Sequence, residues 1–405
     1  MMAALTGTVS KDLHALSSFA WIGSAHLIAI AGSQPLTGRL TDIFGRRAGM
    51  VTANVIFLIG KLICGIAPNT QVFILGRVLC GIGGGSVTSI SNYIANDLLP
   101  TRSRGLWQGI GNIFVGIGTG LGGPYGGWLA DLKGWRFAFL VNVAPTILAT
   151  ILCAITVKIP PIKSKSGKVG LKRVDFLGAF TLVLALVLML VGLNSGGRIV
   201  PWSHPLVSVT IVLGALFLGV FVYVEQRVEE PMIPVRLLLN RTVACACLSN
   251  WLIMMSMFGL FFSSPVYFQV LGFTTAQAGA RLAPQGIGIG IGSLITGIYI
   301  KKSGGYLRIQ YVNTFLFVVA MGLICTMESY LQMSWPPFIY ICLAGIAWGG
   351  FVNCNMIALI TAVGAADQAV ITAASFAFRA VGSAMGVTVS SAVSVFLSSF
   401  VIQTC

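Results

Sequence analysis

The sequence predicts an all-α protein that crosses a membrane many times. Only 9% of its 405 residues are charged and 56% are hydrophobic, whereas soluble domains carry about 25% charged residues. A surface that faces water cannot be built from so few charges. A transmembrane helix needs about 20 mostly apolar residues. Twelve runs of the chain meet this length: 17–38, 49–67, 71–95, 106–128, 135–157, 176–194, 205–224, 243–269, 278–300, 309–328, 336–362 and 369–403.

The basic residues predict how these runs are oriented. Seventeen Lys and Arg lie in the loops after the odd-numbered runs, and the opposite side has four: Lys11, Lys133, Arg136 and Arg198. Because cytosolic loops carry an excess of Lys and Arg, we expect the richer loops to be cytosolic and the N-terminus before the first run to be non-cytosolic. The same bias accounts for the net charge of +15. The expected partner is therefore the lipid bilayer, and no nucleic acid is expected.

A short repeat predicts how the chain is divided. Residues 37–45 and 296–304 share the pattern T-G-x3-[DK]-x2-G, each at the cytosolic end of an apolar run. Parallel repeats of this kind are typical of transporters in which two helical bundles move about a central site. We therefore expect an N-terminal bundle at 1–157, a cytosolic loop with an extra helix pair at 158–241, and a C-terminal bundle at 242–405.

The stretch GRLTDIFGRR, residues 38–47, carries four charged residues in ten, and we interpret it as a short loop between the first two runs. Its glycines allow a tight turn and close helix approach, its carboxylate can bind at the N-terminus of a neighbouring helix, and its last two arginines can anchor at the membrane edge. The stretch matches G-x-L-x-D-x-x-G-R-[KR], and so resembles the signature loop of the major facilitator superfamily. The resemblance implies two pseudo-symmetric helical bundles. It also implies a conformational latch formed by Gly38, Asp42, Gly45, Arg46 and Arg47. The alternative is an ordinary cytosolic loop with basic anchors.

Arg77 lies inside the third run, where a charge is costly unless it is paired or hydrated. Its spacing to Gly81, R-x-x-x-G, resembles a motif in the fourth helix of the same superfamily. That resemblance implies a part in proton coupling. The alternative is an arginine whose side chain extends to the membrane edge.

The fourth run carries the pattern G-(x8)-G-(x3)-G-G-P-x-G-G. It resembles the motif g-(x8)-G-(x3)-G-P-x-x-G-G of drug/proton antiporters, except that Gly123 stands where the motif has proline. Such glycines give a smooth, bendable helix face for close packing between the half-bundles. The residues concerned are Gly109, Gly118, Gly122, Gly123, Pro124, Gly126 and Gly127.

Further stretches resemble the fourteen-helix branch of fungal transporters, among them GWRFAFLVNVAP (134–145), PVYFQVLGFTTAQAG (265–279) and R-x2-G-x3-G from Arg379. The stretches ALSSFAWIGSAHLIA and RGLWQGIGNI narrow the resemblance to fungal vacuolar basic amino acid transporters. Since the chain has twelve runs where that plan has fourteen, we expect its first and last helices to be missing.

Three asparagines are the candidates for substrate contact. Asn112, Asn142 and Asn250 lie near these motifs, in helices that the resemblance implies line a cavity. The alternative for each is a hydrogen bond that only packs helices together.

The residue patterns of an enzyme are absent from the sequence. There is no nucleotide-binding loop of the type G-x4-G-K-[ST] and no Ser/His/Asp arrangement, and Cys245-x-Cys247 has no His or acid beside it. We therefore expect neither a cofactor nor a metal. All ten acidic residues lie at the edges of runs or in loops, although a proton antiporter or a carrier of cationic amino acids is expected to have a carboxylate within the membrane.

These patterns predict a secondary transporter that works by alternating access on small molecules and protons. The first hypothesis, which the resemblance implies, is proton-coupled export of basic amino acids into the vacuole by a monomer in the vacuolar membrane. The second is a plasma-membrane efflux pump for drugs or toxins, which the glycine motif favours. The third is a truncated, non-transporting remnant, which the missing membrane carboxylate favours.

Overall fold

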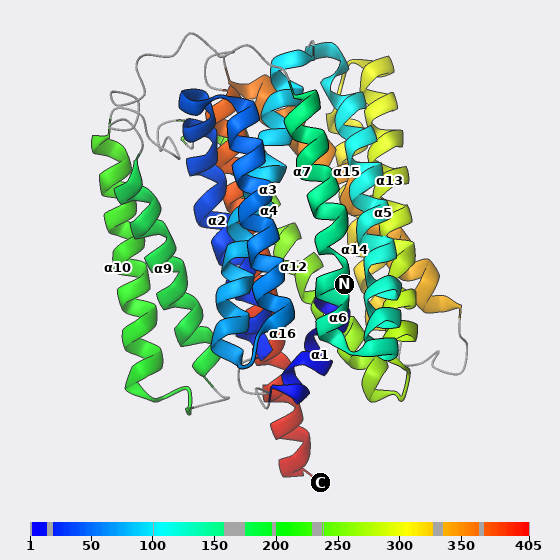
Figure 1. Ribbon diagram of the computed structural model, residues 1–405. Coiled ribbons are helices and arrows are strands. Elements are labelled where there is room, and N and C mark those ends of the chain that lie inside the picture. The colour runs from blue at the N-terminus through cyan, green and yellow to red at the C-terminus, as the bar shows by residue number, and fades with distance from the viewer. Residues whose placement is uncertain are drawn as a thin grey trace. The chain divides into compact units, whose positions relative to one another are not determined.

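The structure is a computed structural model, and it describes residues 2–13, 19–99, 101–157, 175–196, 200–228, 237, 239–326, 335–363 and 368–404. The main elements of these residues are α-helices (Figure 1). In chain order they are α1 (Met2–Asp12), α2 (Phe19–Phe44), α3 (Arg46–Ile66), α4 (Thr70–Leu98), α5 (Thr101–Lys133), α6 (Trp135–Val141), α7 (Val143–Thr156), α9 (Phe176–Ser195), α10 (Pro205–Arg227), α12 (Arg241–Val270), α13 (Thr275–Ser303), α14 (Leu307–Cys325), α15 (Pro336–Ala362) and α16 (Gln368–Thr404).

Each of the twelve predicted runs coincides with helix in the described residues. Within that part of the chain, nine helical segments are long and apolar enough to cross a membrane, judged by length and composition. The remaining three runs coincide with α2, α5 and α16. The fifth run is divided into α6 and α7 by a break at Asn142, and α1 was not among the predicted runs. The all-helical, multi-pass fold class is confirmed.

The prediction of a charged loop at residues 38–47 is wrong for its backbone. Helix α2 continues to Phe44 and α3 begins at Arg46, so Gly45 alone separates the two helices. The six residues before Gly45 include neither Gly nor Pro, and so none of them ends the helix. Gly45 does, because its φ of 90° lies in the left-handed region that favours glycine. Gly304, the matching glycine of the repeat, also has a positive φ, of 71°, and ends α13 in the left-handed helical conformation, whereas Gly45 has an extended ψ of 148°.

Contacts within the chain divide it into two compact units. One unit contains Met1–Leu5, Ala95–Trp135 and Ser264–Gly364; the other contains Thr6–Ile94, Arg136–Ser263 and Ala365–Cys405. Each unit therefore draws on both halves of the sequence. The expected division at residues 157 and 241 follows chain order instead, and it stays a prediction.

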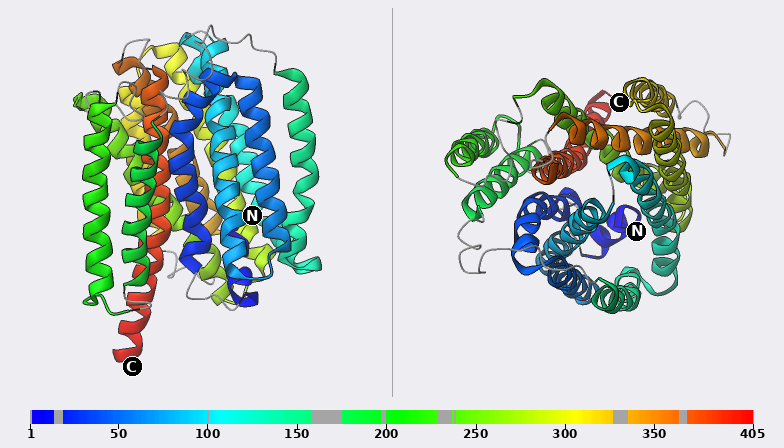
Figure 2. Two further views of the ribbon diagram at one scale, coloured as in Figure 1. Left: turned by 60° about the vertical axis from the view of Figure 1, so that its left-hand side comes forward. Right: turned by 90° about the horizontal axis from the view of Figure 1, so that it is seen from above.

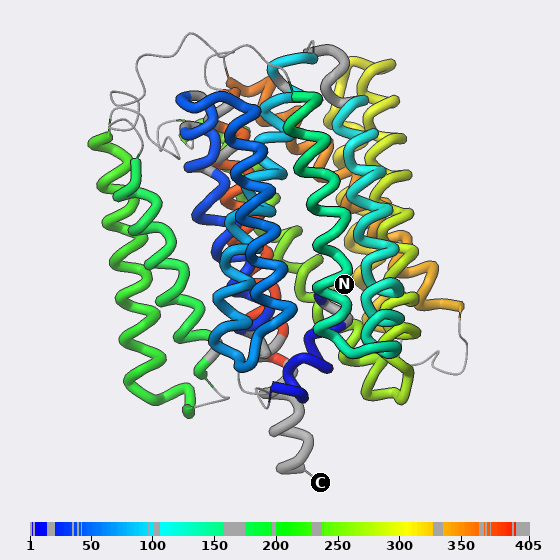
Figure 3. The backbone as a smooth tube through the Cα atoms, in the orientation of Figure 1, coloured from blue at the N-terminus to red at the C-terminus, as the bar shows by residue number. Residues whose placement is uncertain are grey.

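In the first unit, α13 packs against α5 and α15, and α14 packs against α15. Figure 3 shows α5 in cyan and α13 in yellow side by side. Phe268, Ala278, Leu282 and Ile341 form a buried cluster that joins the end of α12 to α13 and α15. This cluster fixes one end of α13.

In the second unit, α9 pairs with α10 (Figure 2), α2 packs against α9 and α16, and α3 packs against α7. Helices α3 and α4 approach through two reciprocal contacts. A Cβ atom on Gly60 would lie 2.9 Å from Cys80 Sγ, and one on Gly76 would lie 2.7 Å from Cys64 Sγ. Each helix thus presents Gly-x3-Cys to the other, which allows antiparallel backbones to lie close together.

Candidate functional site

Helices α5 and α13 meet along a line of small residues. A Cβ atom on Gly120 would lie 2.8 Å from the Ala283 carbonyl oxygen, and one on Gly123 would lie 2.9 Å from the Gly279 carbonyl oxygen. Real Cβ atoms do not approach backbone within 3.0 Å, so both positions need glycine. We call this contact the glycine seam. It consists of Gly109, Gly116, Gly120, Gly123 and Gly127 on α5 and of Ala276, Gly279, Ala283, Gly286, Gly290 and Ser293 on α13.

Only some of the antiporter-like motif lies in the glycine seam. Gly109, Gly123 and Gly127 belong to it, whereas a Cβ atom on Gly118 would meet nothing within 4 Å. Apart from Gly118, which is exposed, the motif residues outside the defined seam are half-buried or buried, and they are Gly122, Pro124 and Gly126. Helix α5 continues through Pro124. Gly116 and Gly120 belong to the seam but not to the motif. A search for small residues spaced by seven would have found them, because such residues recur every seven positions where two helices cross at a shallow angle.

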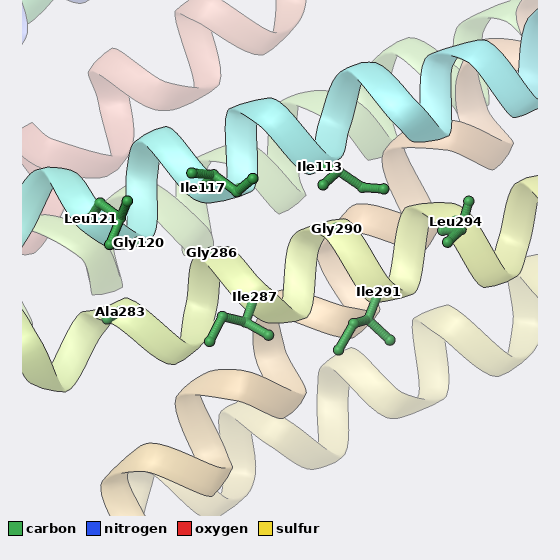
Figure 4. A pocket seen from close by; sticks show the side chains of 11 residues that line it. Ile113, Ile117, Gly120, Leu121, Ala283, Gly286, Ile287, Gly290, Ile291 and Leu294 are labelled. Atoms are coloured by element: carbon green, nitrogen blue, oxygen red, sulfur yellow. The ribbon is translucent and has the colours of Figure 1, made fainter.

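An apolar pocket of about 380 Å³ opens beside the glycine seam (Figure 4). Ile117 is 50% exposed, and Leu121 and Ile287 are each 62% exposed. The walls carry no side chain that can form a hydrogen bond or hold a charge, so the pocket suits a hydrocarbon group and not the polar part of a substrate. Its lining is Ile113, Gly116, Ile117, Gly120, Leu121, Ala283, Gly286, Ile287, Gly290, Ile291 and Leu294.

Two of the predicted latch residues join α2 and α3 to α4. A Cβ atom on Gly38 would lie 3.1 Å from the Tyr93 hydroxyl oxygen, so this glycine allows α4 to approach. Arg46 is buried, and its Nη1 donates to Thr41 Oγ1 at 2.6 Å. Its guanidinium carbon lies 5.2 Å from the centre of the Tyr93 ring. These contacts hold Arg46 between helices, and its expected role as a membrane-edge anchor stays a prediction.

The other latch residues lie around the same break. Gly45 makes the turn, and Arg47 is exposed at the start of α3. Asp42 belongs to the last turn of α2, but its side chain lies outside the described residues. The role of the five residues as a latch stays a prediction.

Arg77 is buried between α4 and α2. Its Nε donates to the Ile22 carbonyl oxygen at 3.3 Å, and His26 Nδ1 lies 3.4 Å from the carbonyl oxygen of Arg77. The guanidinium is thus held within the bundle and does not extend to an exposed edge, which was the alternative reading. Its part in proton coupling stays a prediction.

Each of the three predicted asparagines forms a hydrogen bond within the protein. Asn112 donates to Ser293 Oγ across the glycine seam at 2.8 Å, and Asn250 donates to Ser375 Oγ of α16 at 3.0 Å. Asn142 donates to a carbonyl oxygen one turn before it at 2.7 Å, where α6 breaks from α7. The structure therefore gives each of them a packing role, and contact with substrate stays a prediction.

Lys61, in α3, supports this break. Its Nζ donates to Thr146 Oγ1 at 2.8 Å and to the Asn142 carbonyl oxygen at 3.4 Å. It also lies 4.3 Å from the centre of the Phe57 ring. Asn142 is the N-cap of α7, and its carbonyl oxygen also accepts a hydrogen bond from Thr146 Oγ1 at 2.7 Å. The ammonium group therefore links α3 to the start of α7.

Arg379 was not among the predicted site residues. It lies eleven residues after the start of α16 at Gln368, which is about 16 Å along the helix axis. Its guanidinium carbon lies 5.1 Å from the centre of the Phe376 ring, and the guanidinium forms no hydrogen bond or ion pair with any described residue. A search of the apolar runs for basic residues with no acid nearby would have found it beside Arg77.

The acidic residues of the described part lie at helix ends. Asp175 is the N-cap of α9 and accepts a hydrogen bond from the Gly178 amide at 2.7 Å. Five others lie in the last turn of a helix: Asp12, Asp42, Asp97, Asp131 and Glu225. Glu229, Glu230, Glu328 and Asp367 lie outside the described residues. Among the residues that the structure describes, no three His, Cys, Asp or Glu side chains gather so as to hold a metal ion.

Comparison with known proteins decides the family. The model of the Major Facilitator Superfamily matches residues 1–387. The chain belongs to the major facilitator superfamily. It is therefore a secondary transporter and not an enzyme, and the resemblance drawn from residues 38–47 is confirmed.

Relatives within the superfamily differ in what they are named for. The chain is 35% identical to multidrug resistance protein fnx1 of Schizosaccharomyces pombe, over 96% of this chain and 74% of that one. It is 31% identical to the vacuolar membrane amino acid uptake transporter fnx2 of the same yeast, over 95% and 67%. It is 30% identical to vacuolar basic amino acid transporter 2 of Saccharomyces cerevisiae, over 92% and 81%. The names include both drugs and amino acids, so they leave the substrate open.

Solved structures support the facilitator fold. The human organic anion transporter MFSD10 aligns with a TM-score of 0.65 at 17% identity, over 96% of this chain and 83% of that one. The proton:xylose symporter XylE aligns with a TM-score of 0.64 at 14% identity, over 95% and 83%. At these identities the likeness concerns the fold alone.

Proposed function

We propose that this transporter moves amino acids, basic ones first among them, from the cytosol into the vacuole in exchange for protons. The observation that carries the proposal is the sign of the charges within the helices. Lys61, Arg77, Arg281 and Arg379 lie more than one turn inside described helices, whereas the described acids lie at helix ends. Positively charged side chains within the helices favour the carboxylate group that every amino acid brings, whereas the preference for basic amino acids rests on the relative named as a basic amino acid transporter. Two relatives named as vacuolar amino acid transporters support the same choice.

In this proposal the transporter acts as a monomer by alternating access. The α2–α3 turn at Gly45 belongs to the latch, and Arg77 takes part in proton coupling. Because a guanidinium inside the membrane is costly unless it is hydrated or paired, a change in its surroundings changes the energy of the whole helix arrangement. The hydrogen bond from Arg77 to the Ile22 carbonyl links that charge to α2, the helix that ends at the latch.

The second candidate is efflux of drugs or toxins across the plasma membrane. The apolar pocket beside the glycine seam favours it, since its walls accept a hydrocarbon group. Relatives named as a multidrug resistance protein and as the efflux pump dotC of Dothistroma septosporum point the same way. The third candidate is a non-transporting remnant, which requires that neither amino acids nor drugs are transported.

Uptake of radiolabelled lysine and arginine into vacuolar vesicles tests the proposal. We expect uptake that depends on an acidic vesicle interior and stops when a protonophore collapses the gradient. Uptake equal to that of empty-vector vesicles contradicts it. Hydrophobic dyes measured in the same vesicles then separate the efflux pump, which moves the dye, from the remnant, which moves neither.

A further inference from the structure

Arg379 belongs to one face of α16, and this face packs against α12. Ser375, Arg379, Gly382 and Gly386 follow at intervals of four, three and four residues, which places them on one side of a helix. A Cβ atom on Gly382 would collide with the Trp251 carbonyl oxygen. The stripe therefore faces α12, and Arg379 lies within it.

The side chains of this stripe are arranged as hydrogen-bond donors. Asn250 is buried on α12 and donates from Nδ2 to Ser375 Oγ at 3.0 Å. The Ser375 hydroxyl accepts that bond and donates to no described residue, so its proton remains available. The guanidinium of Arg379 has five N–H donors and no acceptor, and no described residue accepts from it. Donors without acceptors fit an anion.

The position of Arg379 makes an unpartnered charge costly. Its guanidinium is directed toward the start of α16 and lies over Phe376, a residue about 12 Å along the helix. The predicted apolar run of this helix begins at residue 369 and the hydrocarbon core of a bilayer is about 30 Å thick, so we place the charge inside that core. A charge at that depth requires a partner or water. The aromatic ring holds the planar group in place but cannot neutralise it.

We propose that Arg379, together with the Ser375 hydroxyl that Asn250 holds, binds the carboxylate of the transported molecule. A guanidinium matches a carboxylate with two parallel hydrogen bonds, and Ser375 can supply a third. One guanidinium offsets one negative charge, so a carboxylate fits better than a phosphate dianion. The inference rests on the proposed function for the identity of the ligand as a substrate, and it narrows that function to molecules that carry a carboxylate.

Protection of Arg379 from phenylglyoxal, a reagent that modifies guanidinium groups, tests the site in the full chain. The chain is reconstituted in lipid nanodiscs, and modification is followed by peptide mass spectrometry. Three competitors are compared: a mixture of the standard amino acids without arginine, the matching decarboxylated amines such as cadaverine, and inorganic phosphate. We expect the amino acids to slow modification of Arg379 about tenfold and the amines and phosphate to leave it unchanged.

Arg227 is the internal control, because it lies at the end of α10 and its guanidinium carbon is 5.1 Å from the centre of the Tyr223 ring. Its modification should not respond to any competitor. Equal protection of Arg379 by amines and amino acids, or no protection by amino acids, overturns the proposal. This measurement uses the wild-type chain, so it tests the carboxylate site even where a variant fails to fold.

Transport by variants separates this site from the proposed function. We expect Arg379→Gln to lower lysine uptake about 30-fold or more and Arg379→Lys to lower it less, while Arg227→Gln matches the wild type. If Arg379 is protected but no amino acid is transported, the carboxylate site is supported and the proposed function is contradicted. If lysine and cadaverine are transported equally well, the transport function is supported and the carboxylate site is contradicted.

Discussion

Replacing Gly127 by alanine tests whether the glycine seam holds α5 and α13 together. The new methyl carbon would lie 2.7 Å from Ala276 Cα and 2.8 Å from the Thr275 carbonyl oxygen, whereas ordinary contact begins at 3.4 Å. All these neighbours are backbone atoms, so α13 itself must move. It must withdraw by about 0.7 Å, and a gap of about 0.5–1 Å loses a quarter to a half of the dispersion attraction of the atoms involved. We expect overpacking of this kind to cost about 1–3 kcal/mol.

Gly118→Ala is the matched control, since both glycines belong to the same motif and the same helix. A Cβ atom on Gly118 meets nothing within 4 Å, and alanine favours a helix by about 1 kcal/mol over glycine. Thermal unfolding of the purified variants in detergent should give a lower transition temperature for Gly127→Ala and an unchanged or higher one for Gly118→Ala. Equal transition temperatures for the two variants would refute the idea that the glycine seam is a packing contact.

Three further predictions concern the latch and the buried arginine. Gly45→Ala should lower the transition temperature through a backbone strain of about 1–2 kcal/mol, because the φ of 90° disfavours a Cβ atom. The control is Gly111→Ala, where a Cβ atom meets nothing within 4 Å. Equal transition temperatures for the two variants would contradict this prediction. Asp42→Asn should impair transport while the chain still inserts in membranes, and wild-type uptake rates at equal membrane abundance would argue against a latch. Arg77→Lys keeps the charge but loses the planar fork; if it takes up lysine at the wild-type rate, Arg77 has only a structural role.

The spans were predictable because hydropathy is local. A run of about 20 apolar residues must form a helix in lipid, since every backbone group needs a partner within the segment. The helix ends were less predictable. Charge marks where the chain leaves the hydrocarbon, but it does not end a helix, and α2 continues through the charged residues to Phe44. The signal for the turn was Gly45 alone, whose conformation no other residue adopts at so little cost.

Which distant helices pack against each other could not be predicted from the sequence. A glycine face shows that another backbone comes close, but it does not identify the partner. Helix α13, which packs against α5, begins more than 140 residues after α5 ends. The same holds for Asn250, which donates to Ser375 across 125 residues. The sequence singled out Asn250 but not its partner, and so Arg379, one turn beyond Ser375, escaped notice as a site residue.

The run GIGIGIG at residues 286–292 shows how a pattern can suit two structures. Alternation with a period of two is typical of a strand, yet the run lies in the middle of α13. Residues two apart on a helix point about 200° apart, so the four glycines separate into two pairs. Gly286 and Gly290 face α5. Gly288 and Gly292 face α15.

This division allows α13 to lie against two helices at once, each at backbone distance. Cβ atoms on Gly288 and Gly292 would collide with the backbone of Cys342 and Ile346, while Ile287 and Ile291 point away to the apolar pocket, 62% and 43% exposed. Alanine at Gly292 must therefore move α13 away from α15 without touching α5. Disulfide cross-linking between cysteines placed on each helix pair measures this: Gly292→Ala should slow the α13–α15 cross-link and leave the α13–α5 cross-link unchanged. Equal slowing of both would mean that α5, α13 and α15 move as one body.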